Sequence, residues 1–165
     1  MAIGRKPVIV RKFSREWLSG YAASEEMGST HELELLDSSG KVNRISWDQI
    51  KWVCSVRELP ASGDTSNPER LLRRRFTAKP RNPGIWLRIL FPDGEELEGL
   101  APNDRTLITG AGLFITPPDT RSNTQRVFIP RSAIAQLELL GLIPQPGQRK
   151  SPAPAQPDLF PSDSE

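Results

Sequence analysis

The chain has 165 residues, of which 36% are hydrophobic and 25% are charged, and its formal net charge at pH 7 is +2. This length predicts one domain or two very small ones, and so small a net charge does not by itself indicate a nucleic-acid partner. One cysteine, Cys54, and one histidine, His31, exclude an intramolecular disulfide, a multi-cysteine zinc site and most catalytic triads.

No apolar run in the sequence approaches the roughly 20 residues that a membrane helix needs. Residues 1–12 alternate charged residues with Val and Ile and lack the apolar block of a signal peptide. Together with the single cysteine, these features predict a cytoplasmic protein in a reducing compartment.

The first part of the chain has the two-residue periodicity of β-strands. In residues 31–37, for example, Leu33 and Leu35 alternate with Glu32 and Glu34. We therefore predict a first β-barrel-like half over residues 5–58. Its five expected strands cover residues 8–13, 16–23, 31–37, 42–46 and 50–56.

A proline-rich and basic linker is predicted over residues 59–83. Arginine presents planar, bidentate donors to phosphate, so the basic residues of this linker are candidate nucleic-acid or phosphate ligands. The alternative is a solvated linker whose cations pair with Glu95, Glu96 and Glu98. The candidate residues are Arg70, Arg73, Arg74, Arg75, Lys79 and Arg81.

The spacing of Arg70 and Arg74 resembles the R-x-x-x-R motif that opens the PilZ signalling domain, which implies a cyclic dinucleotide ligand. The second PilZ motif, D-x-S-x-x-G, should follow on a strand. The stretch from Asp104 to Gly110 has Thr106 in place of serine and the wrong glycine spacing. This departure weakens the resemblance.

A second β-barrel-like half is predicted over residues 84–143. A turn follows its first strand, because Pro92 presets φ and Gly94 accepts a positive φ without a Cβ clash. The expected strands cover residues 85–91, 95–101, 113–116, 126–129 and 134–140.

Alignment of the two halves indicates an internal duplication. Phe13, Leu18 and Gly20 match Phe91, Leu97 and Gly99 if the second half carries one extra turn residue, and residues 45–50 match 129–134. Gly20 and Gly99 would each allow a strand to bend sharply. The alternative is chance similarity between two β-meanders.

The loop at residues 117–126 begins with two prolines. Rigid loops often carry binding sites, and the candidates here are Asp119, Arg121, Asn123 and Arg126. The alternative is a structural connector in which Asp119 and Asn123 bond to the loop's own backbone.

The C-terminal segment, residues 144–165, contains six prolines and few apolar residues. Such a composition cannot bury enough surface to offset the entropy of ordering, so a disordered tail is expected. The apolar residues at 157–160 are a candidate docking peptide or carry no function.

Motifs for catalysis are absent from the sequence. There is no G-x-S-x-G, HExxH or Walker loop, and we interpret Cys54 as a buried core thiol. We expect no catalytic residue, metal site or cofactor.

Several stretches resemble known families. Residues 87–104 and 126–139 resemble the two Sm motifs, which implies a small Sm-like or SH3-like β-barrel. Residues 17–22, 50–59, 73–76, 93–99 and 112–129 resemble an uncharacterised bacterial family built of tandem halves. The resemblance implies a bacterial origin and names no activity.

The sequence thus predicts an all-β protein of two packed small barrels with a disordered tail. We expect a non-enzymatic binding or adaptor module in a bacterial regulatory or signalling context, with a protein partner. The alternative is RNA or cyclic dinucleotide binding through the arginine-rich linker.

Overall fold

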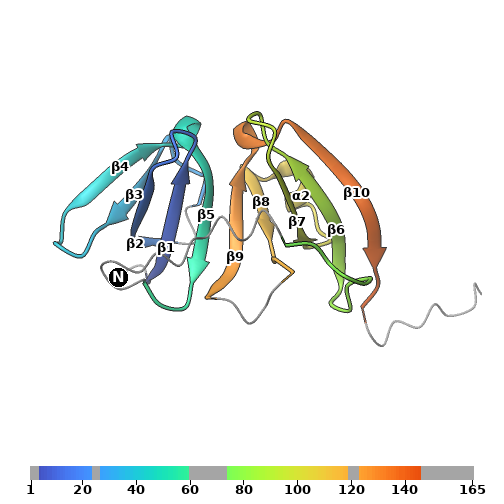
Figure 1. The fold of residues 1–165 in the computed structure, drawn as a ribbon. Helices are drawn as coiled ribbons and strands as arrows, with labels where there is room; N and C mark the ends of the chain where they lie inside the picture. Colours follow the sequence, from blue (N-terminus) through green and yellow to red (C-terminus); the bar gives the residue numbers. More distant parts are fainter. Residues whose placement is uncertain (1–3, 24–26, 60–73, 119–122, 146–165) are drawn as a thin grey trace, which may run out of the picture.

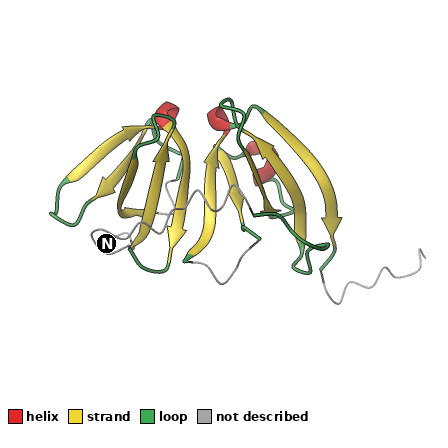
Figure 2. Cartoon of the chain, in the orientation of Figure 1, coloured by secondary structure: helices red, strands yellow, loops and turns green. Residues whose placement is uncertain are grey.

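The structure is a computed structural model that describes residues 4–23, 27–59, 74–118 and 123–145. It confirms the predicted all-β class, because within these ranges the chain forms mainly antiparallel strands (Figures 1 and 2). Arg70, Arg73, Asp119, Arg121 and the predicted tail from residue 146 lie outside the described residues.

Among the described residues, five strands precede the linker and five follow it, and we call these two groups the first and second halves. The first half contains β1 (Arg5–Lys12), β2 (Trp17–Ala23), β3 (Glu32–Leu36), β4 (Val42–Ser46) and β5 (Ile50–Val56). The second half contains β6 (Gly84–Leu90), β7 (Glu96–Ala101), β8 (Gly112–Ile115), β9 (Thr124–Pro130) and β10 (Gln136–Ile143). A short helix, α2 (Thr106–Thr109), connects β7 to β8.

The strands form two antiparallel sheets, and neither is a closed barrel. One sheet has the order β4-β3-β2-β1-β5-β9-β8, and the other has the order β10-β6-β7. A single bridge between Leu100 and Thr116 links β7 to β8. The prediction of two small β-barrels is therefore corrected to two antiparallel sheets. The second edge of β5 pairs with β9 of the other half, so β4 does not close onto it.

The strand order is the same in the two halves. The first half has the order β4-β3-β2-β1-β5, and the second has β9-β8-β7-β6-β10 once the bridge is included. The register also agrees, because Val8 lies opposite Gly20 as Leu87 lies opposite Gly99. Each half has a 3-10 turn before its last strand, at Trp47–Gln49 and Arg131–Ala133.

The turn after the first strand of each half corrects one detail of the alignment. The Lys12 N–H donates to Glu16 O at 3.0 Å, and the Phe91 N–H donates to Glu95 O at 2.9 Å. Phe91 therefore occupies the position of Lys12 rather than that of Phe13. The extra turn residue proposed for the second half is not present.

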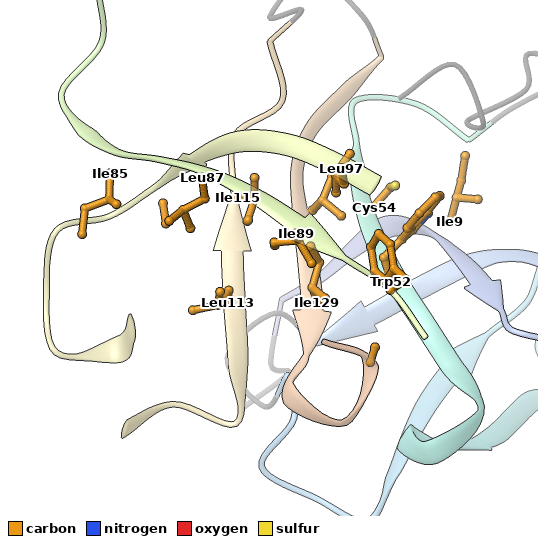
Figure 3. Packing of buried hydrophobic residues seen from close by; sticks show 14 of the residues in the cluster. Ile9, Trp52, Cys54, Ile85, Leu87, Ile89, Leu97, Leu113, Ile115 and Ile129 are labelled. Carbon is orange, nitrogen blue, oxygen red and sulfur yellow. The ribbon is translucent and has the colours of Figure 1, made fainter. Parts of the chain in front are cut away.

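The two halves share their hydrophobic core. Phe128 of β9 belongs to the cluster of the first half, and Val56 of the first half belongs to the cluster of the second. Figure 3 shows Ile9, Trp52 and Cys54 of the first half in the cluster of the second. Strand β5 is buried on both faces, since successive side chains of a strand point to opposite faces. Within the described residues, no helix is long and apolar enough to cross a membrane.

Candidate functional site

The described part of the basic linker runs along the three-stranded sheet and is partly neutralised there. The Arg75 guanidinium lies 3.4 Å from a Glu96 carboxylate oxygen and 3.5 Å from one of Glu98. This arrangement agrees with the alternative in which the linker pairs with the acids of β7.

Glu98 is the centre of this contact, and its side chain is only 3% exposed. Its Oε1 accepts hydrogen bonds from Trp86 Nε1 at 2.8 Å and from the Phe76 backbone N–H at 3.2 Å. Arg88 lies 3.9 Å from Oε2. A buried carboxylate is stable when it is paired and hydrogen-bonded, so Glu98 ties the linker to the sheet.

Two regions that the sequence predicted separately lie together in the structure. Lys79 and Arg81 of the linker line a cleft of about 290 Å³ with Pro117 and Pro118 at the start of the predicted loop. Both cations are exposed. Arg74 is also exposed but does not line this cleft.

The described end of the loop, which includes Asn123 and Arg126, contacts other parts of the fold. Asn123 Oδ1 accepts from the backbone N–H groups of Arg57 and Glu58, both at 3.1 Å, and its Nδ2 donates to Glu58 O at 2.8 Å. The Arg126 guanidinium lies 4.5 Å from the centroid of the Phe114 ring. These contacts hold the loop to the end of β5 and to β8.

The single cysteine and the single histidine of the chain differ in their exposure. Cys54 is fully buried, and burial raises the pKa of its thiol to about 12 despite a hydrogen bond with Thr124. His31 is exposed and lines a cleft of about 500 Å³ with Arg5, Glu32 and other residues of the first half. Within the described ranges, no three His, Cys, Asp or Glu residues are grouped as a metal site.

Sequence reasoning did not identify Lys51, a buried cation that joins the two halves. Its side chain is 2% exposed, and its Nζ donates to Asp93 at 2.6 Å and also to Glu95. Burial alone would raise the pKa of Asp93, but the bonds from Lys51 and the Glu95 N–H, with the Lys51 charge, lower it below its usual value. The one feature of the sequence that could have indicated this buried cation is the lysine within the otherwise apolar segment of β5.

The exposed apolar face of β10, a strand that the sequence did predict, is the second feature that sequence reasoning missed. It pairs with β6 and lies at the edge of its sheet, at the far end of the molecule from β4 (Figure 1). Leu137, Leu139 and Leu142 of this strand are 38%, 66% and 61% exposed.

These leucines lie on the face of the sheet that carries the core. Their cross-strand partners in β6 are Ile89, Leu87 and Ile85, all of which are buried. Residues directly opposite each other in an antiparallel pair share one face. An apolar face therefore continues from the core onto an edge strand that the other described residues leave exposed.

The equivalent strand of the first half is covered. In β5, Val53 is fully buried because it lies opposite Phe128 of β9. Leu137 occupies the corresponding position in β10, since Val53 pairs with Val10 as Leu137 pairs with Ile89. Strand β9 covers the edge of β5 and the apolar face at Val53. The corresponding edge and face of β10 are exposed.

Comparison with known proteins identifies a family. No curated protein and no solved structure matches this chain. One family model, which carries no functional description, matches residues 4–141 and so spans both halves and the linker between them. The chain therefore belongs to the family of unknown function DUF6982.

Proposed function

We propose that this protein is a non-enzymatic interaction module that binds an extended, apolar protein segment along β10. The observation that carries the proposal is the edge of β10 that no other described strand pairs with, together with its three exposed leucines. An edge strand offers backbone donors and acceptors to a further strand, and partner strands bind in this way in several recognition domains.

The exposed leucines supply the specificity in this proposal. Alternate side chains of an added strand point to the same face, so an apolar residue at every second position of the partner would contact Leu137 and Leu139. A segment with that pattern would continue the apolar face that Leu87 and Ile89 begin in β6.

The proposal also includes the origin of the architecture. We infer that the two halves are Sm-like or SH3-like units that arose by duplication. The common strand order, the common register at Gly20 and Gly99 and the 3-10 turn in each half support this origin. We place the module in a bacterial, cytoplasmic regulatory setting, as the sequence resemblance implies.

Site-specific photo-crosslinking in cells tests the binding surface. A photo-reactive residue at position 139 should capture a partner protein, whereas the same residue at position 108 should not. Ile108 is a matched control because it is 80% exposed and lies on α2 rather than on β10. Equal capture at both positions, or none at 139, would contradict the proposal.

The cleft beside the linker supports a second candidate function, the binding of RNA or a cyclic dinucleotide. Lys79 and Arg81 are exposed there, and no ion pair involving either is seen among the described residues. Phosphate contacts make affinity fall with salt, with a log–log slope of about −0.7 per neutralised charge for single strands.

Binding assays on single-stranded RNA and a cyclic dinucleotide test this candidate. The double variant Lys79→Ala/Arg81→Ala should reduce affinity and lower the salt slope. The control Lys6→Ala/Lys41→Ala removes the same charge from exposed positions in the first half. A similar loss in both double variants would indicate only a general charge effect, and the absence of binding at low salt would remove the candidate.

A further inference from the structure

We propose that a second copy of this chain occupies β10 and that the two β10 strands pair antiparallel about a twofold axis. This inference rests on the proposed function, because it names the partner of the same surface. The two three-stranded sheets would then form one continuous sheet, in the order β7-β6-β10-β10-β6-β7.

The first half shows what kind of strand such an edge requires. Strand β5 is covered by β9, which places Phe128 opposite Val53, and Phe114 of β8 packs on Phe128 with the ring centroids 5.0 Å apart. On the face that meets the core, β9 places the Phe128 ring against Val53, the counterpart of Leu137, and Arg126 opposite Ser55, the counterpart of Leu139. A strand that covers β10 in the same way must bring an apolar side chain to Leu137, and also one to Leu139, because a leucine stands there in place of Ser55.

Strand β9 follows β5 in the sheet, and its counterpart in the first half is β4. Strand β4 of another copy does not meet this requirement. In the first half, Arg44 of β4 lies opposite Glu34 of β3. These two residues occupy the positions that Phe128 of β9 and Phe114 of β8 have in the second half. The Arg44 guanidinium lies 3.6 Å from Glu34, and both side chains are more than half exposed. A head-to-tail contact of β10 with β4 of another copy would cover the leucines with an ion pair.

Strand β10 itself does meet the requirement. Of the six large hydrophobic side chains that are exposed within the described residues, three belong to β10. All three lie on one face, so an antiparallel second copy would place leucines beside leucines. A twofold contact uses the same patch on both copies and therefore closes.

The opposite face of β10 is compatible with this pairing. Glu138 is the one acidic side chain of the strand, and its carboxylate lies 3.3 Å from an Arg88 nitrogen. The charge is thus paired within each copy. An unpaired carboxylate would repel the same carboxylate of a second strand, whereas the paired Glu138 allows that strand to approach.

Sedimentation of the full chain tests the inference, over protein concentrations from low micromolar to near millimolar. The wild type should shift from monomer to dimer, and Leu139→Lys should remain monomeric throughout. Val42→Lys, a matched change at an exposed residue of edge strand β4, should dimerise as the wild type does. A monomeric wild type would overturn the inference.

Mixing the two variants separates the twofold contact from a head-to-tail contact. If β10 pairs with β4, each variant alone is monomeric, and a mixture forms a one-to-one dimer through its two intact surfaces. That result would also overturn the inference. Melting curves establish that Leu139→Lys is folded, which we expect because Leu139 is 66% exposed.

A cysteine substitution gives an independent measurement. Leu139→Cys should form a disulfide-linked dimer on mild oxidation, because a twofold axis near this position brings the two thiols together. Ile108→Cys should not, and the native Cys54 is buried and does not interfere. If the wild type is monomeric but position 139 still captures another protein in cells, this inference fails while the proposed function stands.

Discussion

At the scale of single residues, two buried charges hold the molecule together. Glu98 joins the linker to β6 and β7, and Lys51 joins β5 to the turn between those strands. Each charged group has several partners, as buried charges generally require. Neither acts at an exposed surface, so we assign both to stability.

Replacement of Glu98 by alanine should reduce the free energy of unfolding by about 2–4 kcal/mol, because it leaves the Trp86 Nε1–H, the Phe76 N–H and two guanidinium groups without their carboxylate. Urea denaturation measures the loss. Glu98→Gln is the control, because its amide oxygen can still accept both hydrogen bonds and its loss should be smaller. Equal losses in the two variants would show that the charge, rather than the hydrogen bonds, is what matters.

Replacement of Lys51 by methionine should cost about 1–3 kcal/mol at neutral pH, since Asp93 and Glu95 lose a common donor but can hydrate. Lys51 also lies 4.8 Å from the centroid of the Phe91 ring. Methionine keeps the apolar part of this contact, so the loss reports mainly on the charge.

The same pair makes stability depend on pH. The pKa of Asp93 is lowered in the folded protein, so its contribution is present above the unfolded-state value of about 4 and is lost as the pH falls through the lower folded value. The stability difference between the wild type and Lys51→Met should therefore narrow as the pH is reduced below about 4. Urea denaturation of both proteins at a series of pH values measures this stability difference. A difference that stays constant with pH would contradict the role given to the Lys51–Asp93 pair.

At the scale of elements, the second strand of each half carries a glycine at a point of close approach. A Cβ on Gly20 would lie 2.5 Å from Leu36 O and 3.0 Å from the Leu35 side chain. A Cβ on Gly99 would overlap Ile115 and lie 2.9 Å from Thr116 O. In both halves the third strand crosses directly over the glycine, so only glycine allows the two backbones to approach.

Gly20→Ala and Gly99→Ala should each lower stability by about 1–3 kcal/mol through overpacking against backbone atoms that cannot move away easily. Thermal melts compare the two variants. Gly4→Ala is the control, because a Cβ at Gly4 meets no atom within 4 Å. A large loss at Gly99 with none at Gly20 would show that the two positions are not equivalent and would count against duplication.

At the scale of the whole molecule, neither half has a complete core of its own. The first half uses Phe128 of β9, and the second uses Trp52, Cys54 and Ile9 of the first. The Trp52 ring packs against Phe91 of the second half with the centroids 5.5 Å apart. The two halves are therefore joined by apolar side-chain packing and by the pairing of β5 with β9.

The two halves should consequently unfold as one cooperative unit. Residues 1–60 and 80–143, expressed separately, should each fail to give a sharp melt, because each fragment exposes the large side chains that the other covers. Circular dichroism measures the transitions. The full chain is the control, and two soluble fragments with sharp melts would contradict the shared core.

The sequence by itself determined the local structure. Each of the ten predicted strands is present with ends within a few residues of those expected, because alternation and turn residues act over short distances. The turn at Gly94, with φ of +88°, was also recognisable from its Pro-Asp-Gly sequence. The resemblance of several stretches to an uncharacterised family is confirmed as far as an uncharacterised domain, because the family model matches residues 4–141.

Only the tertiary structure decided which strands meet and which surfaces stay exposed. Strands β5 and β10 are both rich in apolar residues, yet Val53 is fully buried and Leu139 is 66% exposed. A two-residue pattern shows that a face is apolar but not which distant strand covers it. Strand β9 covers β5, whereas β10 has one strand beside it within the described chain, and this long-range difference leaves β10 as the candidate binding surface.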